Sequence, residues 1–115
     1  MAKYFKREEF ACPCCGQDEI KDELILKLDQ VRESYGRAMK INSGYRCLKH
    51  NLDVGGKPNS THLGGWAADI SVSDNHERFL LIKAAIPIFA RIEANVGMGW
   101  VHLDCDPDKP QETMF

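Results

Sequence analysis

The segment from Gly55 to Asp69 constrains the fold of this chain more than any other, because a run of turn-forming residues leads directly into a strand pattern. It reads G-G-K-P-N-S-T-H-L-G-G-W-A-A-D, and β-branched residues at alternate positions continue it to Val72. Glycine, proline, asparagine and serine favour turns, so we expect a loop that ends at a strand over 67–72. The loop can deliver the side chain of His62 and the strand that of Asp69.

Two other segments have the apolar spacing of helices. Residues 22–35 place apolar side chains at helical intervals, and Gly36 follows where a helix stop is expected. A second helix begins near Asp74, a candidate cap with Glu77 three residues later, and runs until Pro87 disturbs it. This second helix is nearly apolar, and we expect it to be well buried.

Short strands fill the remaining ordered segments. Candidates are 39–42, 67–72, 91–96 and 100–105, and the last two are separated by G-M-G, which suits a tight connection. With 115 residues and no repeat or linker, the chain is expected to form one domain over 1–115. The sequence predicts a small α+β domain in which a mostly antiparallel sheet packs against two main helices.

Composition excludes several functional classes. Fifteen lysines and arginines against 17 acids give a formal net charge of -2, so no basic field attracts nucleic acid. No apolar run approaches the roughly 20 residues that span a bilayer, and the charged start M-A-K-Y-F-K-R-E-E-F does not resemble a secretory signal. We expect a monomer that is cytoplasmic as synthesised and does not insert into membranes.

Three side chains form a candidate metal site. His62 and Asp69 are joined by His102, which lies in the later segment W-V-H-L-D. Two histidines and one carboxylate match the three-ligand pattern of catalytic zinc, which leaves a fourth position for water or substrate. One zinc ion held in this way can lower the pKa of water to about 7 and polarise a carbonyl, as amide hydrolysis requires.

Three blocks of sequence surround these ligands: S-G-Y-R-C-L-K-H-N at 43–51, G-G-K-P-N-S-T-H-L-G-G-W-A-A-D-I at 55–70, and W-V-H-L-D at 100–104. Together they resemble the D-alanyl-D-alanine carboxypeptidase family of zinc peptidases, the M15 type, which includes many phage endolysins and shares its zinc site with the Hedgehog signalling domain. In that family, serine-x-histidine-x-x-glycine-x-alanine-x-aspartate supplies two zinc ligands and a late histidine the third. The matching positions are Ser60, His62, Gly65, Ala67, Asp69 and His102.

The resemblance also implies a substrate. It points to the peptide stems of bacterial peptidoglycan, cut either by a carboxypeptidase or by an endolysin-type endopeptidase that reaches the cell wall after release. It implies that Arg46 of S-G-Y-R helps to hold the substrate, and we place Ser60 beside it in that role. A guanidinium offers a planar fork of donors that fits a carboxylate or carbonyl near the scissile bond. A surface salt bridge is the other interpretation of Arg46.

The general base is the point at which the sequence departs from better-known relatives. Many carry an acid or a histidine shortly before the last zinc ligand, whereas residues 97–99 here are G-M-G. Asp104 is the nearest candidate, because residues i and i+2 of a strand share a face and His102 is two residues away. Asp104 is equally suited to orienting that histidine, and Glu93 on the neighbouring strand is a further candidate base.

Five cysteines leave a second question open. C-P-C-C at 12–15, followed by Gly16, resembles half of a structural zinc knuckle, with Cys47 and Cys105 as possible completing ligands. The spacing of a complete four-ligand site is absent. We therefore favour a structural contact of Cys12 or Cys14 with Cys47, as packed thiols or as a disulfide, over a second metal.

Two further functions belong to other classes. One is a zinc-stabilised binding module without catalysis, as in the Hedgehog comparison, and the missing upstream base favours it. The other is a small structural protein in which His62, Asp69 and His102 only hydrogen-bond to one another. Replacement of Asp104 separates the enzyme from the binding module, and metal analysis tests the structural protein.

Overall fold

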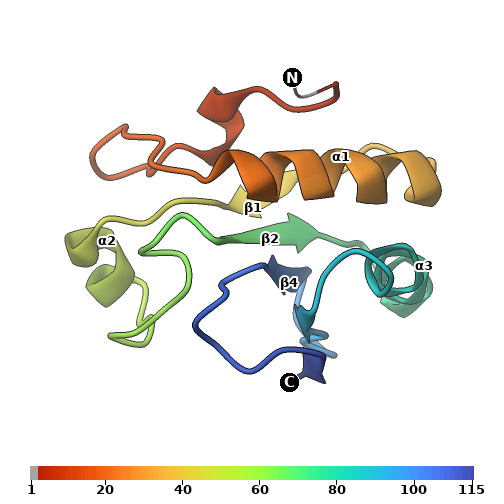
Figure 1. The fold of residues 1–115 in the computed structure, drawn as a ribbon. Coiled ribbons are helices and arrows are strands. Elements are labelled where there is room, and N and C mark those ends of the chain that lie inside the picture. The colour runs from red at the N-terminus through yellow and green to blue at the C-terminus, as the bar shows by residue number, and fades with distance from the viewer. Residues whose placement is uncertain (1–2) are drawn as a thin grey trace.

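A five-stranded sheet organises the computed structural model, which describes residues 3–115 (Figure 1). Its strand order is β1-β2-β4-β3-β5, and all neighbours are antiparallel except β3 and β5. The predicted α+β class with a mostly antiparallel sheet is confirmed, and the first two residues of the expected domain lie outside the described part. The strands are β1 (Ile41–Ser43), β2 (Ala67–Ser71), β3 (Arg91–Glu93), β4 (Trp100–Asp104) and β5 (Thr113–Met114).

Both predicted helices form. Helix α1 (Asp22–Tyr35) ends at Gly36, whose φ of 72° is the left-handed conformation that glycine tolerates best. Helix α3 (Asn75–Ala85) begins after Asp74, whose carboxylate accepts a hydrogen bond from the backbone N–H of Glu77 at 2.8 Å. Within residues 3–115, no helix has the length and apolar character needed to cross a bilayer.

Short elements escaped the sequence patterns. These are a 3-10 helix, η1 (Arg7–Phe10), the helix α2 (Leu48–Asp53) and the strand β5, none long enough to show a period. Strand β3 also ends earlier than expected from 91–96. The reason is local, because Asn95 has a φ of 52° and Gly97 a φ of 93°, outside the extended region that a strand needs.

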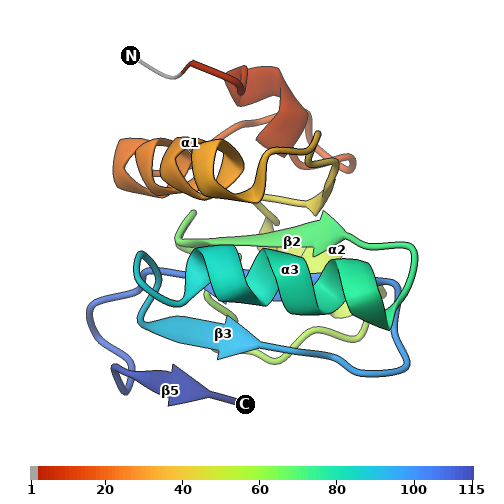
Figure 2. The same ribbon diagram turned by 90° about the vertical axis from the view of Figure 1, so that its right-hand side faces the viewer.

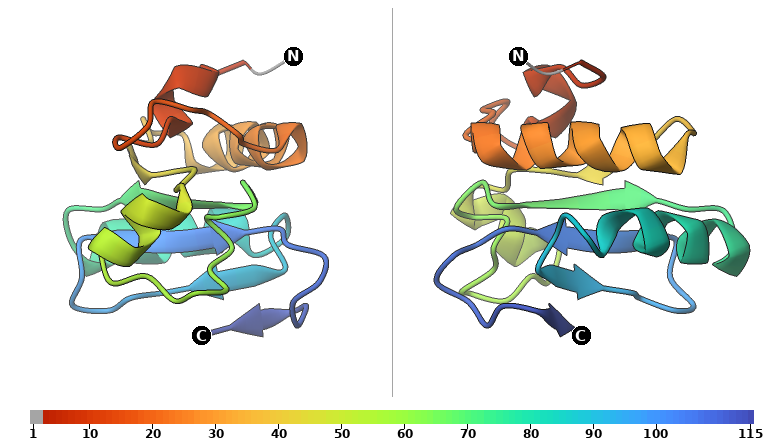
Figure 3. Two further views of the ribbon diagram at one scale, coloured as in Figure 1. Left: turned by 90° about the vertical axis from the view of Figure 1, so that its left-hand side faces the viewer. Right: turned by 45° about the vertical axis from the view of Figure 1, so that its right-hand side comes forward.

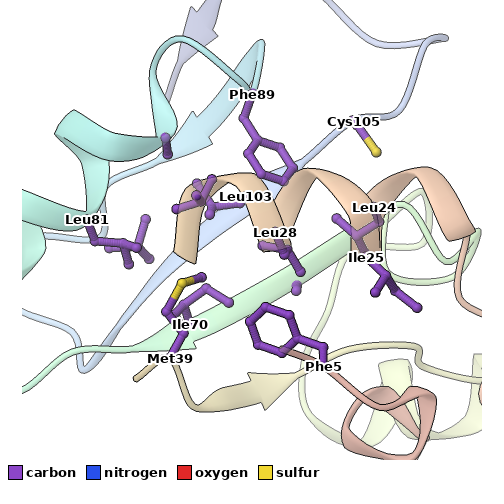
Figure 4. Packing of buried hydrophobic residues seen from close by; sticks show 14 of the residues in the cluster. Phe5, Leu24, Ile25, Leu28, Met39, Ile70, Leu81, Phe89, Leu103 and Cys105 are labelled. Atoms are coloured by element: carbon purple, nitrogen blue, oxygen red, sulfur yellow. The ribbon is translucent and has the colours of Figure 1, made fainter. Parts of the chain in front are cut away.

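The two faces of the sheet have different roles. On one face Ala68 lies opposite Leu103, which lies opposite Ile92, and all three are buried. They join apolar residues of α1 and α3 in one core, in which Leu28 and Leu81 lie close to Leu103 (Figure 4). Helix α3 lies over this face (Figure 2). The opposite face therefore remains available for polar side chains, and α2 lies on that side (Figure 3, left).

Helix α3 is less buried than its apolar sequence predicts. Leu81, Ala84 and Ala85 are buried against the core, but Phe79 is 64% exposed and Ile86 58% exposed. The expectation of a well-buried helix is wrong because α3 lies at the edge of the domain and covers the sheet with one side only. Its buried charged residue is Arg78, whose guanidinium donates to the backbone carbonyls of Ala94, Met98 and Trp100.

Candidate metal centre

Strands β1, β2, β4 and β3 place polar side chains in one row across the free face of the sheet. Ser43 of β1 lies opposite Asp69 of β2, and Asp69 lies opposite His102 of β4. His102 in turn lies opposite Glu93 of β3. Because directly opposed residues of antiparallel strands project to the same side, the register alone brings Asp69, His102 and Glu93 together.

The loop before β2 returns the remaining histidine to this row. Gly65 makes the return possible, since its φ is 76° and a Cβ there would lie 2.0 Å from the carbonyl oxygen of Glu19. His62 Nδ1 lies 2.7 Å from the carbonyl oxygen of Gly44, so this nitrogen donates and Nε2 faces Asp69 Oδ1 at 3.3 Å. The side chain of His62 is thus buried in a fixed orientation.

The three predicted ligands meet in a cluster whose donor atoms lie within 4.8 Å of one another. His102 contributes Nδ1, 3.0 Å from Asp69 Oδ1, and its Nε2 lies 2.7 Å from Asp104 Oδ2. All three ligands are buried. Two imidazole nitrogens and one carboxylate oxygen suit zinc, and each histidine has a partner for its other nitrogen, as zinc histidines generally do. The donor chemistry of the cluster therefore fits one zinc ion.

Charge is concentrated on this cluster. Burial raises the pKa of Asp69, but hydrogen bonds from His102 and His62 outweigh burial and hold that pKa well below its ordinary value. Burial lowers the pKa of His102, whereas hydrogen bonds with Asp104 and Asp69 raise it, to about 9. The raised pKa favours an imidazolium at His102, between two carboxylates, in the metal-free protein, and a zinc ion held there would take the place of its proton.

Asp104 lies behind His102 rather than beside the open side of the cluster. Its side chain is 0% exposed and accepts from Arg91 Nε at 2.6 Å, besides its contact with His102. Burial raises the pKa of Asp104, but the hydrogen bond and charge of His102 and the charge of Arg91 lower it below its ordinary value. A buried carboxylate with a lowered pKa is a weak base, so these contacts favour the orienting role over proton transfer.

Arg46 reaches the cluster from the segment between β1 and α2. Its Nη2 donates to Asp69 Oδ2 at 3.3 Å, its Nε to Ser43 Oγ at 3.1 Å and its Nη1 to Asn51 Oδ1 at 3.3 Å. Asn51 is fully buried and donates to the carbonyl of Lys57 at 2.8 Å. The guanidinium is therefore held at the metal cluster and is not a surface ion pair.

A cleft of about 520 Å³ opens over the cluster. Glu93 and Trp100 line it on the β3 and β4 side, and Ser60 lines it on the loop side. Ser60 Oγ also accepts from the backbone N–H of His62 at 3.2 Å, which ties this loop residue to a ligand. The lining residues are Arg46, Val54, Gly55, Gly56, Lys57, Asn59, Ser60, Thr61, His62, Asp69, Arg91, Glu93, Trp100, His102, Lys109 and Phe115.

Sequence reasoning missed three supporting residues. Asn51 positions Arg46, Arg91 pairs with Asp104, and Thr61 Oγ1 lies 3.4 Å from Asp104 Oδ2. Arg91 could have been found, since it is two residues before Glu93 and so shares its strand face. Asn51 closes the S-G-Y-R-C-L-K-H-N block, but nothing in its local pattern shows that its side chain turns inward.

The cysteines separate into two places. Cys12 Sγ lies 3.7 Å from Cys47 Sγ, which is the contact expected between the N-terminal segment and the arginine loop. Cys105 lies elsewhere, in the hydrophobic core, with its Sγ 3.7 Å from the carbonyl oxygen of Trp66. Cys105 is therefore not positioned to complete a metal site with the other thiols.

The sequence that carries this site matches a known protein family. No sequence among curated proteins matches the chain significantly. A family model described as peptidase M15 matches residues 3–104, a range that contains all three clustered ligands, Arg46 and Glu93. The match covers most of the 115 residues. The chain belongs to the peptidase M15 family, whose members are zinc-dependent metallopeptidases.

Proposed function

We propose that this protein is a zinc metallopeptidase that hydrolyses amide bonds in the peptide stems of peptidoglycan. The observation that carries the proposal is the buried group of His62, Asp69 and His102 at the base of a polar cleft. Family membership supports peptide hydrolysis, and the resemblance to D-alanyl-D-alanine carboxypeptidases supports the wall peptide as substrate. The site of action in this proposal is the bacterial cell wall, after release of the protein.

Zinc held by these ligands supplies a Lewis acid for the scissile carbonyl and lowers the pKa of water to about 7. The chain itself then provides the proton transfer. Glu93 is placed for this task because it is half-buried, lines the cleft and lies directly opposite His102 on the adjacent strand. We assign Glu93 as general base. It takes the role that an acid shortly before the last zinc ligand has in many relatives, where this chain has G-M-G at 97–99.

Asp104 orients a ligand in this proposal. Its carboxylate fixes the ring of His102 through Nε2, so that Nδ1 points at the cluster. Arg91 holds Asp104 in turn through its Nε. This chain of contacts keeps the imidazole of His102 in one orientation, with Nδ1 directed at the position that zinc would occupy.

Arg46 and Ser60 bind the substrate. Arg46 lines the cleft with a guanidinium held by Ser43 and Asn51, so a carboxylate or carbonyl of the peptide meets an ordered pair of donors. Ser60 also lines the cleft, and its hydroxyl accepts from the N–H of His62. A free terminal carboxylate on Arg46 favours a carboxypeptidase, whereas a backbone carbonyl there favours an endopeptidase.

The second candidate function is a zinc-stabilised binding module. The observation that favours it is the sequence Gly97-Met98-Gly99, which places no proton-transfer group shortly before His102. Such a module uses the same cleft for binding and has no need of the Glu93 carboxylate. The two functions therefore differ in what Glu93 does.

The deciding experiment incubates the purified protein with peptidoglycan fragments, with and without a zinc chelator, and identifies the products by mass spectrometry. We expect chelator-sensitive release. Alanine as the product establishes a carboxypeptidase, and larger fragments establish an endopeptidase. No release at any tested pH, from protein shown to contain zinc, would contradict the enzyme and leave the binding module.

A further inference from the structure

We propose that the chain holds a second, structural zinc ion between Cys12, Cys15 and Cys47, with Cys14 as the fourth ligand. This site is separate from the proposed function, because none of these residues lines the cleft. The sulfur atoms of Cys12, Cys15 and Cys47 all lie within 4.8 Å of one another. The sequence alone favoured a pair of packed thiols, and the structure adds the third sulfur.

The N-terminal half of the site is a closed turn. Cys12 and Cys15 have the two-residue spacing of zinc-binding cysteine pairs. The N–H of Gly16 donates to the carbonyl of Cys12, and the N–H of Cys12 donates to the carbonyl of Gln17, both at 2.7 Å. Gly16 has a φ of 75°, which permits the chain to reverse after the pair. The backbone therefore presents both sulfurs on one side of the turn.

The other half of the site begins α2. Cys47 caps that helix, and its Sγ accepts from the N–H of His50 at 3.4 Å. The N–H of Cys47 donates to Cys12 Sγ at 3.5 Å. Backbone donors aimed at sulfur stabilise the thiolate that binds a metal. These donors favour a thiolate, which a metal site requires and a pair of packed neutral thiols does not.

The fourth ligand is assigned from its place on the turn. The thiol of Cys14 is exposed between Cys12 and Cys15 in sequence, and the nearby thiol of Cys47 raises its pKa, so Cys14 borders the three clustered sulfurs. A structural zinc site has four protein ligands in tetrahedral arrangement, commonly all cysteines. The alternative fourth donor is the imidazole of His50, whose backbone already bonds to Cys47. A disulfide between Cys12 and Cys47 would leave Cys14 and Cys15 as free exposed thiols.

The proposed site has a structural consequence for the cleft. It joins the turn that follows η1 to Cys47, the residue directly after Arg46. Structural zinc contributes its binding free energy to folding, because the ligands come together only in the folded chain. Zinc at the cysteines therefore anchors the segment that carries Arg46.

The experiment uses the full chain, purified under reducing conditions and loaded with Co²⁺, which gives a sulfur-to-cobalt charge-transfer absorption when thiolates bind it. We expect this absorption in the wild type and in a His62→Ala, His102→Ala double variant, which removes the other site. We expect it to disappear in Cys12→Ser and Cys47→Ser. Cys105→Ala is the matched control, since it removes a thiol outside the cluster and should retain the absorption.

The exposed ligands keep the test independent of folding. If Cys12→Ser or Cys47→Ser does not fold, Cys15→Ser and Cys14→Ser still replace exposed thiols and should weaken the absorption and lower zinc content by one equivalent. If His50→Ala lowers the zinc content by one equivalent while Cys14→Ser leaves the zinc content and the absorption unchanged, the assignment of Cys14 as the fourth ligand is overturned. Absence of the absorption in the wild type, or a Cys12–Cys47 disulfide in its intact mass, would overturn the site.

Discussion

The two candidate metal clusters of this small domain differ in what holds their side chains in place. His62, Asp69 and His102 are buried, two of them on paired central strands, and each imidazole has a partner for its second nitrogen. The cysteine cluster lies in a turn and at a helix start, and it ranges from buried Cys12 to exposed Cys15. The sheet holds the first cluster, whereas a backbone turn and the start of a short helix hold the second.

This difference fits the catalytic role proposed for the histidine cluster and the structural role proposed for the cysteine cluster. A catalytic zinc needs an open position over a rigid set of few ligands, and the cleft above the histidine cluster offers that. A structural zinc needs a closed set of ligands that joins segments far apart in sequence, as Cys12 and Cys47 are. If the two clusters are independent sites, a substitution in one should leave metal binding at the other unchanged.

The largest effect is expected from Asp69→Asn. A neutral amide in place of the shared carboxylate removes a zinc ligand, so we expect no detectable hydrolysis and loss of one equivalent of zinc. The sulfur-to-cobalt absorption of the cysteine cluster should persist, as measured in the same preparation. Arg46 contacts Asp69 and adjoins Cys47, so a simultaneous loss of that absorption would show that the two clusters are coupled through this segment.

Glu93→Gln should separate chemistry from metal binding. Removal of the general base is expected to lower kcat by roughly 10²- to 10⁴-fold, while the zinc content remains that of the wild type. Steady-state kinetics on the released product and metal analysis of the same sample measure both. Glu112→Gln is the control, since this carboxylate is exposed and does not line the cleft. Activity close to the wild type in Glu93→Gln would remove Glu93 from the mechanism.

The histidine cluster should impose a pH dependence on the metal-free protein. The pKa of His102 is raised to about 9, above its unfolded value of about 6.5. The resulting stability is fully present below about pH 6.5 and is lost as pH rises through about 9, by up to about 3 kcal/mol. Denaturant unfolding of chelator-treated protein at several pH values measures this. The same decline in zinc-loaded protein would contradict the replacement of the His102 proton by metal.

The smallest of these effects is expected from Asp104→Asn. Loss of the carboxylate that orients His102 should weaken zinc binding at the histidine cluster by about 10- to 100-fold, as for other partners of zinc histidines. Competition with a chelator measures the affinity, and exposed Asp108→Asn is the control. If zinc affinity is unchanged and kcat falls instead, Asp104 moves a proton and the orienting role is wrong.

Much of the fold and of the site follows from local sequence. The period of residues 22–35 and the cap at Asp74 predict α1 and α3, because helix signals lie within a few residues. The alternation around Asp69 and His102 predicts β2 and β4, and the turn residues between Gly55 and Gly65 predict the loop that carries His62. These three ligands come together as the motifs predict.

The sequence by itself determined which residue types are present and which elements carry them, since propensity and periodicity are properties of neighbouring residues. Only the tertiary structure decided which side chains contact one another. Strand register puts Glu93 beside His102 and Arg91 beside Asp104, and a shift of one residue would send these side chains to the core face. The approach of the N-terminal turn to α2 brings Cys12 to Cys47 and leaves Cys105 in the core, because contacts between distant segments depend on packing of the whole domain.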